Sequence, residues 1–124
     1  MELSDRTVVI TGGAGFIGGR LAEKLVGDND VRVVDDLSAG KREHVPDGAS
    51  LRVADVLDYD AVRKAFDGAD AVFHLAANPD VRSGAEDTRV HMEQNAEATN
   101  IVLDAARDAG VETFAFASSS TVYG

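Results

Sequence analysis

Three glycines, Gly13, Gly15 and Gly18, follow a short apolar run at the spacing Gly-x-Gly-x-x-Gly. A backbone without Cβ atoms turns tightly and lets its N–H groups approach a pyrophosphate closely. Gly12, Gly15 and Gly18 also match a wider spacing, Gly-x-x-Gly-x-x-Gly. Both spacings predict that this segment binds a diphosphate, and the alternative is a glycine-rich turn that holds no ligand.

Phosphate binding of this kind needs a strand before the glycines and a helix after them. The β-branched run at 7–10 is typical of a central strand buried on both faces of a parallel sheet. Ile17, Leu21 and Leu25 then recur every four positions, which is a helical period. The N-terminus of that helix would present free N–H groups and a partial positive charge to the phosphates.

Two carboxylates end the next predicted strand, where the largely apolar run at 31–34 is followed by Asp35 and Asp36. They stand about 20 residues beyond the glycines, where a dinucleotide-binding fold hydrogen-bonds the adenosine ribose. Asp35 is the better candidate, and Asp36, Ser38 and Gly40 lie close enough in sequence to line the same pocket. A carboxylate repels a 2′-phosphate, so NAD is predicted rather than NADP. The alternative is that both aspartates only solvate a loop.

Two further strands are predicted to end near the same ligand. Residues 50–56 form a short alternating strand with Asp55 and Val56 at its carboxyl end, where an adenine would lie. Asp55 is alternatively a helix cap, although Asp58 already accounts for the start of the next helix. Residues 69–77 form a strand that ends in small residues, which suit either a ligand against the backbone or close packing alone. His74 within it is interpreted as a structural histidine.

The rest of the chain supplies one long helix and a last strand. Apolar residues at helical spacing predict a helix from Thr88 to Ala109, with Gly110 as its C-cap. The segment 113–124 is predicted to be a fifth strand that ends in hydroxyl residues. Alternation of strands and helices implies right-handed crossovers and one parallel sheet. We therefore predict an α/β, Rossmann-type doubly wound domain over residues 1–124, with five strands in the order 3-2-1-4-5 and the glycines at the switch point.

Composition limits the partners. The chain has 22 acidic and 12 basic residues, and its formal net charge of −10 argues against nucleic-acid binding. The acids are mostly Asp and the bases mostly Arg, which suits a salt-rich environment, although ordinary solubility is the alternative. The absence of cysteine excludes disulfides and thiol catalysis, and it favours a cytoplasmic location. No apolar stretch reaches the length of a membrane span, so no membrane association is predicted.

Five segments together resemble the extended short-chain dehydrogenase/reductases, and most closely the NAD-dependent epimerase/dehydratase branch that includes UDP-glucose 4-epimerase. These segments, in the order of that family, are 11–18, 35–40, 54–56, 74–77 and 118–124. The resemblance covers essentially the whole chain and implies the N-terminal part of a longer family fold.

The resemblance also implies roles for individual residues. At the adenosine end of the cofactor it places Asp35 at the ribose and Asp55 and Val56 beside adenine. At the pyrophosphate it places Gly12, Gly15, Phe16 and Ile17. Along the middle of the cofactor it places Leu75, Ala76 and Ala77, and on the nicotinamide side Ala117 and Ser118. Asn95 would brace the site from the long helix. Ser119 would be the catalytic hydroxyl that hydrogen-bonds the reacting oxygen of the substrate.

Some features of the family are absent from these residues. Its catalytic pair has the spacing Tyr-x-x-x-Lys, but Tyr59 is followed at that distance by Arg63, and Tyr123 has no fourth residue after it. In the family the lysine lowers the pKa of the tyrosine, which moves the proton that accompanies hydride transfer. Pro79 also stands where family members often carry a basic residue.

We therefore expect this chain to be the NAD-binding portion of a nucleotide-sugar epimerase or dehydratase. We expect it to be catalytically inactive by itself, and a nucleotide-sugar substrate would bind only to a complete chain. One alternative is a stand-alone or engineered binding or assembly module without catalysis. Its fifth strand would leave an unpaired edge that invites self-association. Another alternative is a reductase of the same superfamily, because this half of the fold does not record substrate choice.

Overall fold

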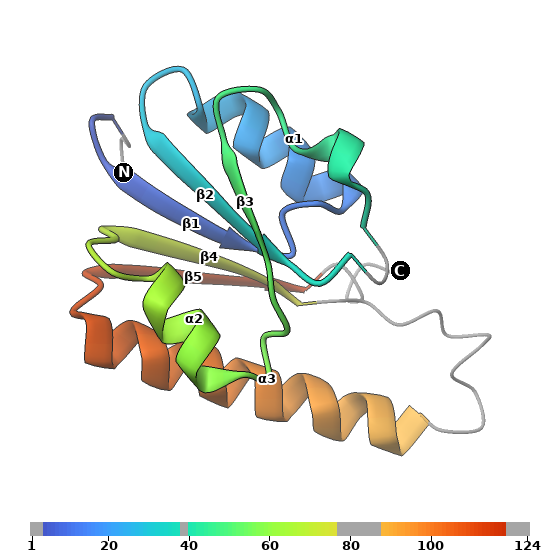
Figure 1. Cartoon of the computed structure of the whole chain (residues 1–124). Coiled ribbons are helices and arrows are strands. Elements are labelled where there is room, and N and C mark those ends of the chain that lie inside the picture. Colours follow the sequence, from blue (N-terminus) through green and yellow to red (C-terminus); the bar gives the residue numbers. More distant parts are fainter. Residues whose placement is uncertain (1–3, 38–39, 77–87, 119–124) are drawn as a thin grey trace.

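The computed structural model describes residues 4–37, 40–76 and 88–118. Within these ranges a single parallel sheet has the strand order β3-β2-β1-β4-β5 (Figure 1). The strands are β1 (Thr7–Thr11), β2 (Asp30–Asp35), β3 (Ser50–Val53), β4 (Ala71–Ala76) and β5 (Thr113–Ser118). The predicted order 3-2-1-4-5 and the predicted Rossmann-type architecture are thus confirmed.

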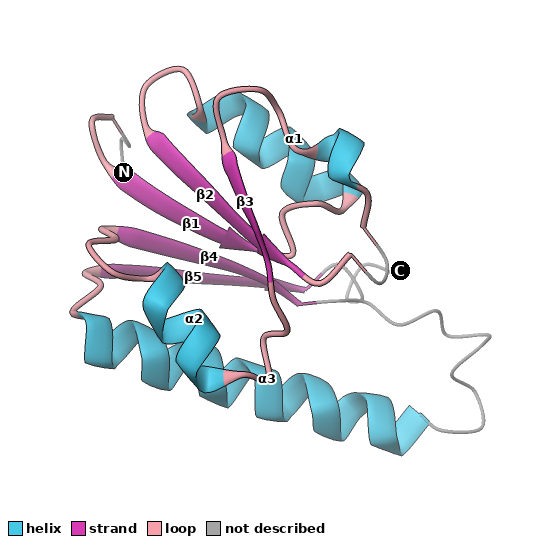
Figure 2. Cartoon of the chain, viewed as in Figure 1, coloured by secondary structure: helices cyan, strands magenta, loops and turns pink. Residues whose placement is uncertain are grey.

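Helices cover both faces of this sheet. They are α1 (Phe16–Leu25), α2 (Tyr59–Ala65) and α3 (Thr88–Ala109), with a short 3-10 turn, η1, at Arg42–His44. Helix α1 and η1 lie on one face, and α2 and α3 lie on the other (Figure 2). Every residue of β1 is β-branched, and its side chains enter the cores on alternate faces. That is why β1 occupies the centre of the sheet.

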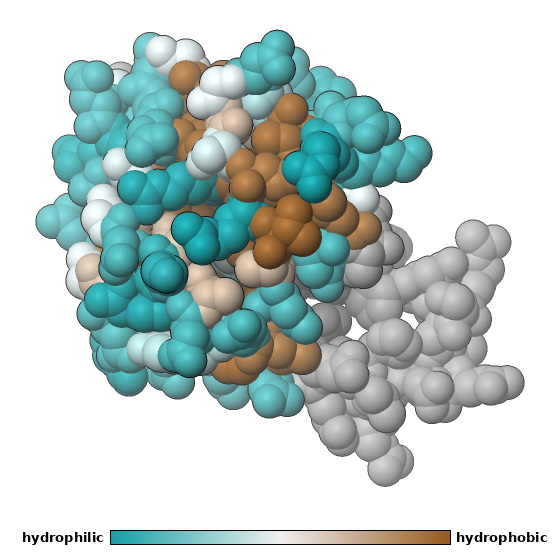
Figure 3. Space-filling model, in the orientation of Figure 1, coloured by the Kyte–Doolittle hydropathy of each residue, from teal (hydrophilic) through white to brown (hydrophobic). Residues whose placement is uncertain are grey.

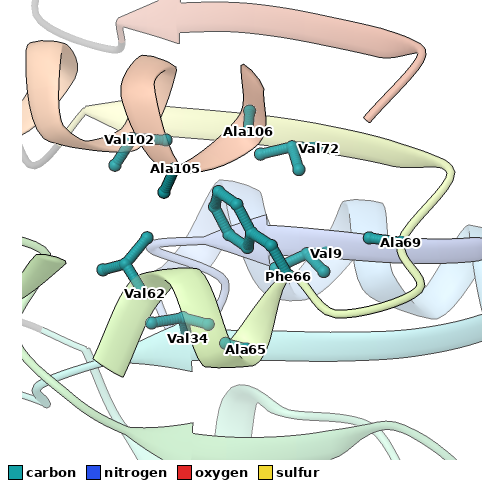
Figure 4. Close-up of a cluster of buried hydrophobic side chains, with 10 residues drawn as sticks. All are labelled: Val9, Val34, Val62, Ala65, Phe66, Ala69, Val72, Val102, Ala105 and Ala106. Carbon is teal, nitrogen blue, oxygen red and sulfur yellow. The ribbon is translucent and has the colours of Figure 1, made fainter. Parts of the chain in front are cut away.

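The larger core lies between the sheet and the pair α2 and α3 (Figure 4). Phe66, which follows α2, is fully buried there among small side chains of β1, β2, β4 and α3. A second core under α1 is formed by Val8, Ile10, Ala22, Val31, Val33 and Ala71. Both cores consist mainly of valine and alanine, so Phe66 is the largest fully buried side chain.

The predicted helix ends agree with the structure. Asp58 is the N-cap of α2, and its side chain accepts a hydrogen bond from the Ala61 N–H at 3.3 Å. Helix α3 has the predicted bounds, and Gly110 after it has a φ of +77°. The Val111 N–H then donates to the Ala106 carbonyl, so the expected glycine C-cap is present.

Two local predictions are wrong. The apolar stripe of α1 was expected to include Ile17, but that side chain is 57% exposed, and Gly18 and Gly19 are buried instead. The helix starts so close to the preceding turn that only glycine fits on its inner face. The third strand was expected to continue to residue 56, but β3 ends at Val53. Asp55 follows in a turn, where its carboxylate accepts the Leu57 N–H at 2.9 Å.

Apolar surface gathers on the face of the molecule that carries the edge strand β3 (Figure 3). Val53, at the end of that strand, is half exposed, and Leu57 is partly exposed. Within the residues that the structure describes, no helix combines the length and the apolar character that crossing a membrane requires.

Candidate dinucleotide site

The turn after β1 requires glycine at its first position. Gly12 has a φ of +75°, and a Cβ there would lie 2.6 Å from the Leu75 carbonyl oxygen of β4. The Gly12 N–H donates to the Val34 carbonyl at 2.8 Å. The turn therefore leaves β1 between the carboxyl ends of β2 and β4.

Two further glycines are required by packing within the protein. A Cβ on Gly18 would lie 2.5 Å from the Gly12 carbonyl oxygen, and a Cβ on Gly13 would lie 2.8 Å from a methyl carbon of Val33. These contacts bring α1 close to the turn and the turn close to β2. Both glycine spacings of the sequence therefore describe one turn. At Gly12, Gly13 and Gly18 the packing of the protein itself excludes a side chain.

Gly15 differs from these three. It is the N-cap of α1 with a φ of −77°, which any residue adopts, and among the described residues a Cβ there would meet only the Gly12 oxygen, at an ordinary 3.4 Å. No other atom of the described residues lies within 4 Å of that Cβ, so the part of the chain that the structure describes does not demand a glycine there. A ligand that approaches the backbone closely would require a glycine at this position. This position therefore fits a diphosphate.

The N-terminus of α1 offers donors at the same place. No side chain among the described residues caps it, and its first turn has no acidic residue. The N–H groups of the first turn have no acceptor within the helix. The side chains of Phe16 and Ile17 are exposed, and the Arg20 guanidinium lies 5.7 Å from the centre of the Phe16 ring. In the part of the chain that the structure describes, amide donors, the positive end of the helix dipole and an uncrowded backbone thus lie at one place.

Asp35 lies at the carboxyl end of β2, beside the glycine turn. Its Oδ2 accepts the Ala14 N–H at 3.0 Å, and its Oδ1 accepts the Leu37 N–H at 2.8 Å. Counting the donors among the described residues, each carboxylate oxygen keeps a second lone pair, which can accept a ribose hydroxyl. Asp36, by contrast, is exposed at the surface. Asp35 as the ribose acceptor and Asp36 as a second lining residue remain predictions.

The candidates after β3 lie around the same end of the sheet. The Ala54 N–H donates to the Asp35 carbonyl at 3.2 Å, which attaches the turn after β3 to the end of β2. Asp55 is exposed, and Val56 is half-buried against the core that contains Phe66. Both remain predictions for the adenine end of the site.

The carboxyl ends of β4 and β5 carry the candidates for the rest of the cofactor. In the register of the two strands Leu75 is paired with Ala117, and Ala76 with Ser118. Asn95 lies in α3. Ser38, Ala77 and Ser119 lie outside the described residues, so their roles remain predictions.

His74 is in β4, near its carboxyl end, and its side chain is buried at 3% exposure. Its Nδ1 is 2.6 Å from the Thr11 hydroxyl, and its Nε2 is 3.4 Å from the Thr99 hydroxyl. Burial lowers the pKa of His74 to about 4, so the ring is neutral at pH 7. A neutral, hydrogen-bonded ring supports its interpretation as a structural histidine.

Two features near the site have no counterpart in the sequence predictions. Leu37 has a φ of +66°, which is strained for a residue with a branched side chain. His44 contacts the Ala14 carbonyl oxygen through Nδ1 at 2.9 Å. No local sequence pattern predicts the φ of Leu37 or the contact of His44, because both depend on segments that come together only in the folded chain.

The geometry defines a nucleotide-binding Rossmann domain, and comparison with known proteins identifies its family. The chain belongs to the NAD dependent epimerase/dehydratase family, whose model matches residues 8–124. The predicted resemblance to this family is therefore confirmed.

Two relatives show the similarity in sequence. The UDP-glucose 4-epimerase of Streptomyces lividans is 38% identical over 120 residues, which are 94% of this chain and 36% of that protein. The NAD-dependent glucose-6-phosphate dehydrogenase of Haloferax volcanii is 38% identical over 122 residues, which are 97% of this chain and 45% of that protein. The chain thus spans less than half the length of these relatives.

Solved structures agree. A UDP-galactose 4-epimerase is 51% identical with a TM-score of 0.82, over 95% of this chain and 40% of that one. The UDP-glucose 4-epimerase of Thermus thermophilus, in complex with NAD, is 38% identical with a TM-score of 0.77, over 87% of this chain and 36% of that one. The fold is therefore that of the corresponding part of these epimerases.

Proposed function

We propose that this chain binds NAD and is the cofactor-binding portion of a nucleotide-sugar epimerase or dehydratase. One observation carries the proposal: the Gly15 backbone precedes the N-terminus of α1 and lies beside the carboxylate of Asp35, and no described side chain crowds that backbone or caps that helix. The family and the NAD complex of the Thermus thermophilus relative support this choice of cofactor.

In this proposal the chain's own groups bind and orient the cofactor. The first N–H groups of α1, at Phe16 and Ile17, would donate to the diphosphate, and the dipole of α1 would favour its negative charge. Asp35 would accept the adenosine ribose hydroxyls and disfavour a 2′-phosphate. When bound, NAD would supply the hydride acceptor for oxidation of a sugar carbon.

The substrate side of the proposal depends on residues that the structure does not describe. The family resemblance assigns to Ser119 the hydrogen bond to the reacting sugar oxygen. The names of several relatives, UDP-glucose 4-epimerases among them, support a nucleotide sugar as the substrate of a complete protein. These 124 residues contain no Tyr-x-x-x-Lys, so we expect no epimerisation by this chain alone.

Calorimetric titration with NAD tests the proposal. We expect the chain to bind NAD, to bind NADP more weakly, and to lose most NAD affinity in Asp35→Ala. Asp47→Ala, which removes an exposed loop carboxylate, is the matched control and should retain the affinity. No heat of binding for the wild-type chain would leave only a structural role, and equal affinities of the two variants would remove Asp35 from the site.

A second candidate, a sugar dehydrogenase, has one observation in its favour. The Haloferax volcanii relative carries that activity in its name and is as similar in sequence as the Streptomyces epimerase. A complete protein that reduces NAD in stoichiometric amounts with a sugar phosphate would support this candidate, whereas an epimerase returns the hydride and yields no net NADH.

The assembly alternative depends on the edge strand β5. In the part of the chain that the structure describes, β5 pairs only with β4, and Phe116 on it is half exposed. Such an edge can pair with a second copy. Sedimentation analysis of the wild-type chain and of Phe116→Lys tests this: concentration-dependent dimers that the substitution abolishes would support it, and a monomer at all concentrations would exclude it.

A further inference from the structure

Both polar groups of the Ala14 backbone are held by the end of β2 and the segment that follows it. The Ala14 N–H donates to Oδ2 of Asp35 at 3.0 Å. The Ala14 carbonyl oxygen accepts from the Lys41 N–H at 2.9 Å and lies 2.9 Å from Nδ1 of His44. Because a carbonyl oxygen only accepts, Nδ1 of His44 carries the hydrogen and donates it.

The same segment packs closely against this turn. A Cβ on Gly40 would lie 2.8 Å from the carbonyl carbon and oxygen of Ala14, so this close approach excludes any side chain at Gly40. The His44 carbonyl oxygen in turn would lie 2.6 Å from a Cβ on Gly19 of α1. Residues 40–44 therefore contact both the glycine turn and the first turn of α1, and we call this segment the clasp.

Holding the Ala14 carbonyl has a consequence at the ligand side. The peptide bond is planar, so two donors on the Ala14 oxygen fix the plane of the Ala14–Gly15 peptide. Gly15 is the N-cap of α1, and its orientation sets the direction in which the next amides, at Phe16 and Ile17, point. These are the proposed donors to the diphosphate. Fixing them before the ligand arrives lowers the entropy cost of binding.

We propose that His44 is a positioning residue, which through the Ala14 carbonyl preorganises the amides of the glycine turn for the diphosphate of NAD. This inference rests on the proposed NAD function. It also gives Asp35 a second role, because one of its oxygens holds the Ala14 N–H while the carboxylate stands at the predicted ribose position. The end of β2 thus couples the ribose and diphosphate parts of the site.

Three variants separate this role from simple packing. His44→Ala removes the donor. His44→Asn retains one, because the amide nitrogen of Asn occupies nearly the place of Nδ1 along the side chain. Asp47→Ala, at an exposed loop residue outside the clasp, is the matched control.

The experiment is a titration of the ¹⁵N-labelled chain, followed by NMR, with NAD, with ADP and with adenosine. We expect His44→Ala to weaken the binding of NAD and ADP roughly three- to tenfold, the loss of one hydrogen bond, and to leave adenosine binding nearly unchanged. His44→Asn should restore most of the affinity, and Asp47→Ala should retain it. In the free protein the Lys41 amide should exchange faster in His44→Ala than in the wild type.

The possible failures are distinct. Equal weakening of ADP and adenosine, or no weakening of either, would overturn the positioning role while leaving NAD binding intact. A wild-type chain that binds neither NAD nor ADP would overturn the proposed function and this inference together. Unchanged exchange of the Lys41 amide in His44→Ala would show that the side chain does not hold the clasp.

Discussion

The hydroxyl of Thr11 and Nδ1 of His74 lie 2.6 Å apart and join the adjacent strands β1 and β4 in the interior. The other ring nitrogen faces Thr99, so the same imidazole connects the sheet to α3. The rings of Phe114 and Phe116 lie beside it, with centroids 6.5 and 5.6 Å away. A ring this enclosed is expected to make the stability of the domain depend on pH.

The first prediction is a loss of stability as the pH falls from 6.5 to 4. The pKa of His74 is about 4 in the folded chain against an ordinary 6.5, so only the unfolded state takes up a proton in this range. The contribution of the neutral ring is therefore complete above pH 6.5, decreases as the pH falls, and is fully lost near pH 4. The slope approaches about 1.4 kcal/mol per pH unit, for a total of roughly 3 kcal/mol.

Urea unfolding at several pH values measures this slope, and His74→Asn isolates it. The variant is expected to be less stable at pH 7 because it loses packing, but its stability should fall less steeply between pH 6.5 and 4. Carboxylates titrate equally in both proteins, so the difference between their pH profiles belongs to His74. Parallel profiles would contradict the assignment.

The second prediction separates glycines required by the fold from the one left open for a ligand. Gly15→Ala adds a Cβ at an ordinary contact distance, so the free protein should keep its stability or gain up to about 1 kcal/mol. Its NAD affinity should fall because the new methyl group occupies the approach to the backbone. Gly18→Ala places a Cβ 2.5 Å from the Gly12 oxygen, and we expect it to destabilise the fold by about 1–3 kcal/mol.

Thermal unfolding without ligand and calorimetric titration with NAD check both variants. A Gly15→Ala protein with unchanged NAD affinity would show that the diphosphate does not approach this position. A Gly18→Ala protein of wild-type stability would mean that α1 shifts freely on the turn.

The architecture was predictable because local signals and the global fold agree. β-Branched runs mark the buried strands, and Asp58 and Gly110 mark helix ends through their own hydrogen bonding and conformation. The wrong details have local causes. Asp55 stops β3 early by accepting a nearby amide, and the closeness of α1 to its preceding turn buries Gly18 in place of Ile17.

The candidate site was predictable only in part. The glycines and Asp35 follow from motif spacing, and the structure places them together. The clasp does not follow from spacing, because the contact of His44 with Ala14 joins residues 30 positions apart. The positive φ of Leu37 has no local signal either, since leucine does not favour it.

The third prediction concerns the core around Phe66. Phe66→Leu leaves unfilled space between the sheet, α2 and α3, and we expect a loss of about 1–2 kcal/mol in the free energy of unfolding. Phe116→Leu makes the same chemical change at a half-exposed position, where about 0.5 kcal/mol or less is expected. Urea unfolding compares the two variants, and equal losses would show that Phe66 is not the centre of the core.

The fourth prediction concerns the acidic surface. With a formal net charge of −10, the folded chain repels itself at low ionic strength, and salt screens that repulsion. We expect the melting temperature to rise by several degrees between low salt and molar KCl. The variant Glu23→Gln/Asp28→Asn/Asp47→Asn changes three exposed acids and takes the net charge from −10 to −7, so its melting temperature should rise less. Calorimetric scans of both proteins over the same KCl series decide the matter. A melting temperature that is independent of KCl, or that rises equally in both proteins, would show that charge repulsion does not limit the stability of this domain.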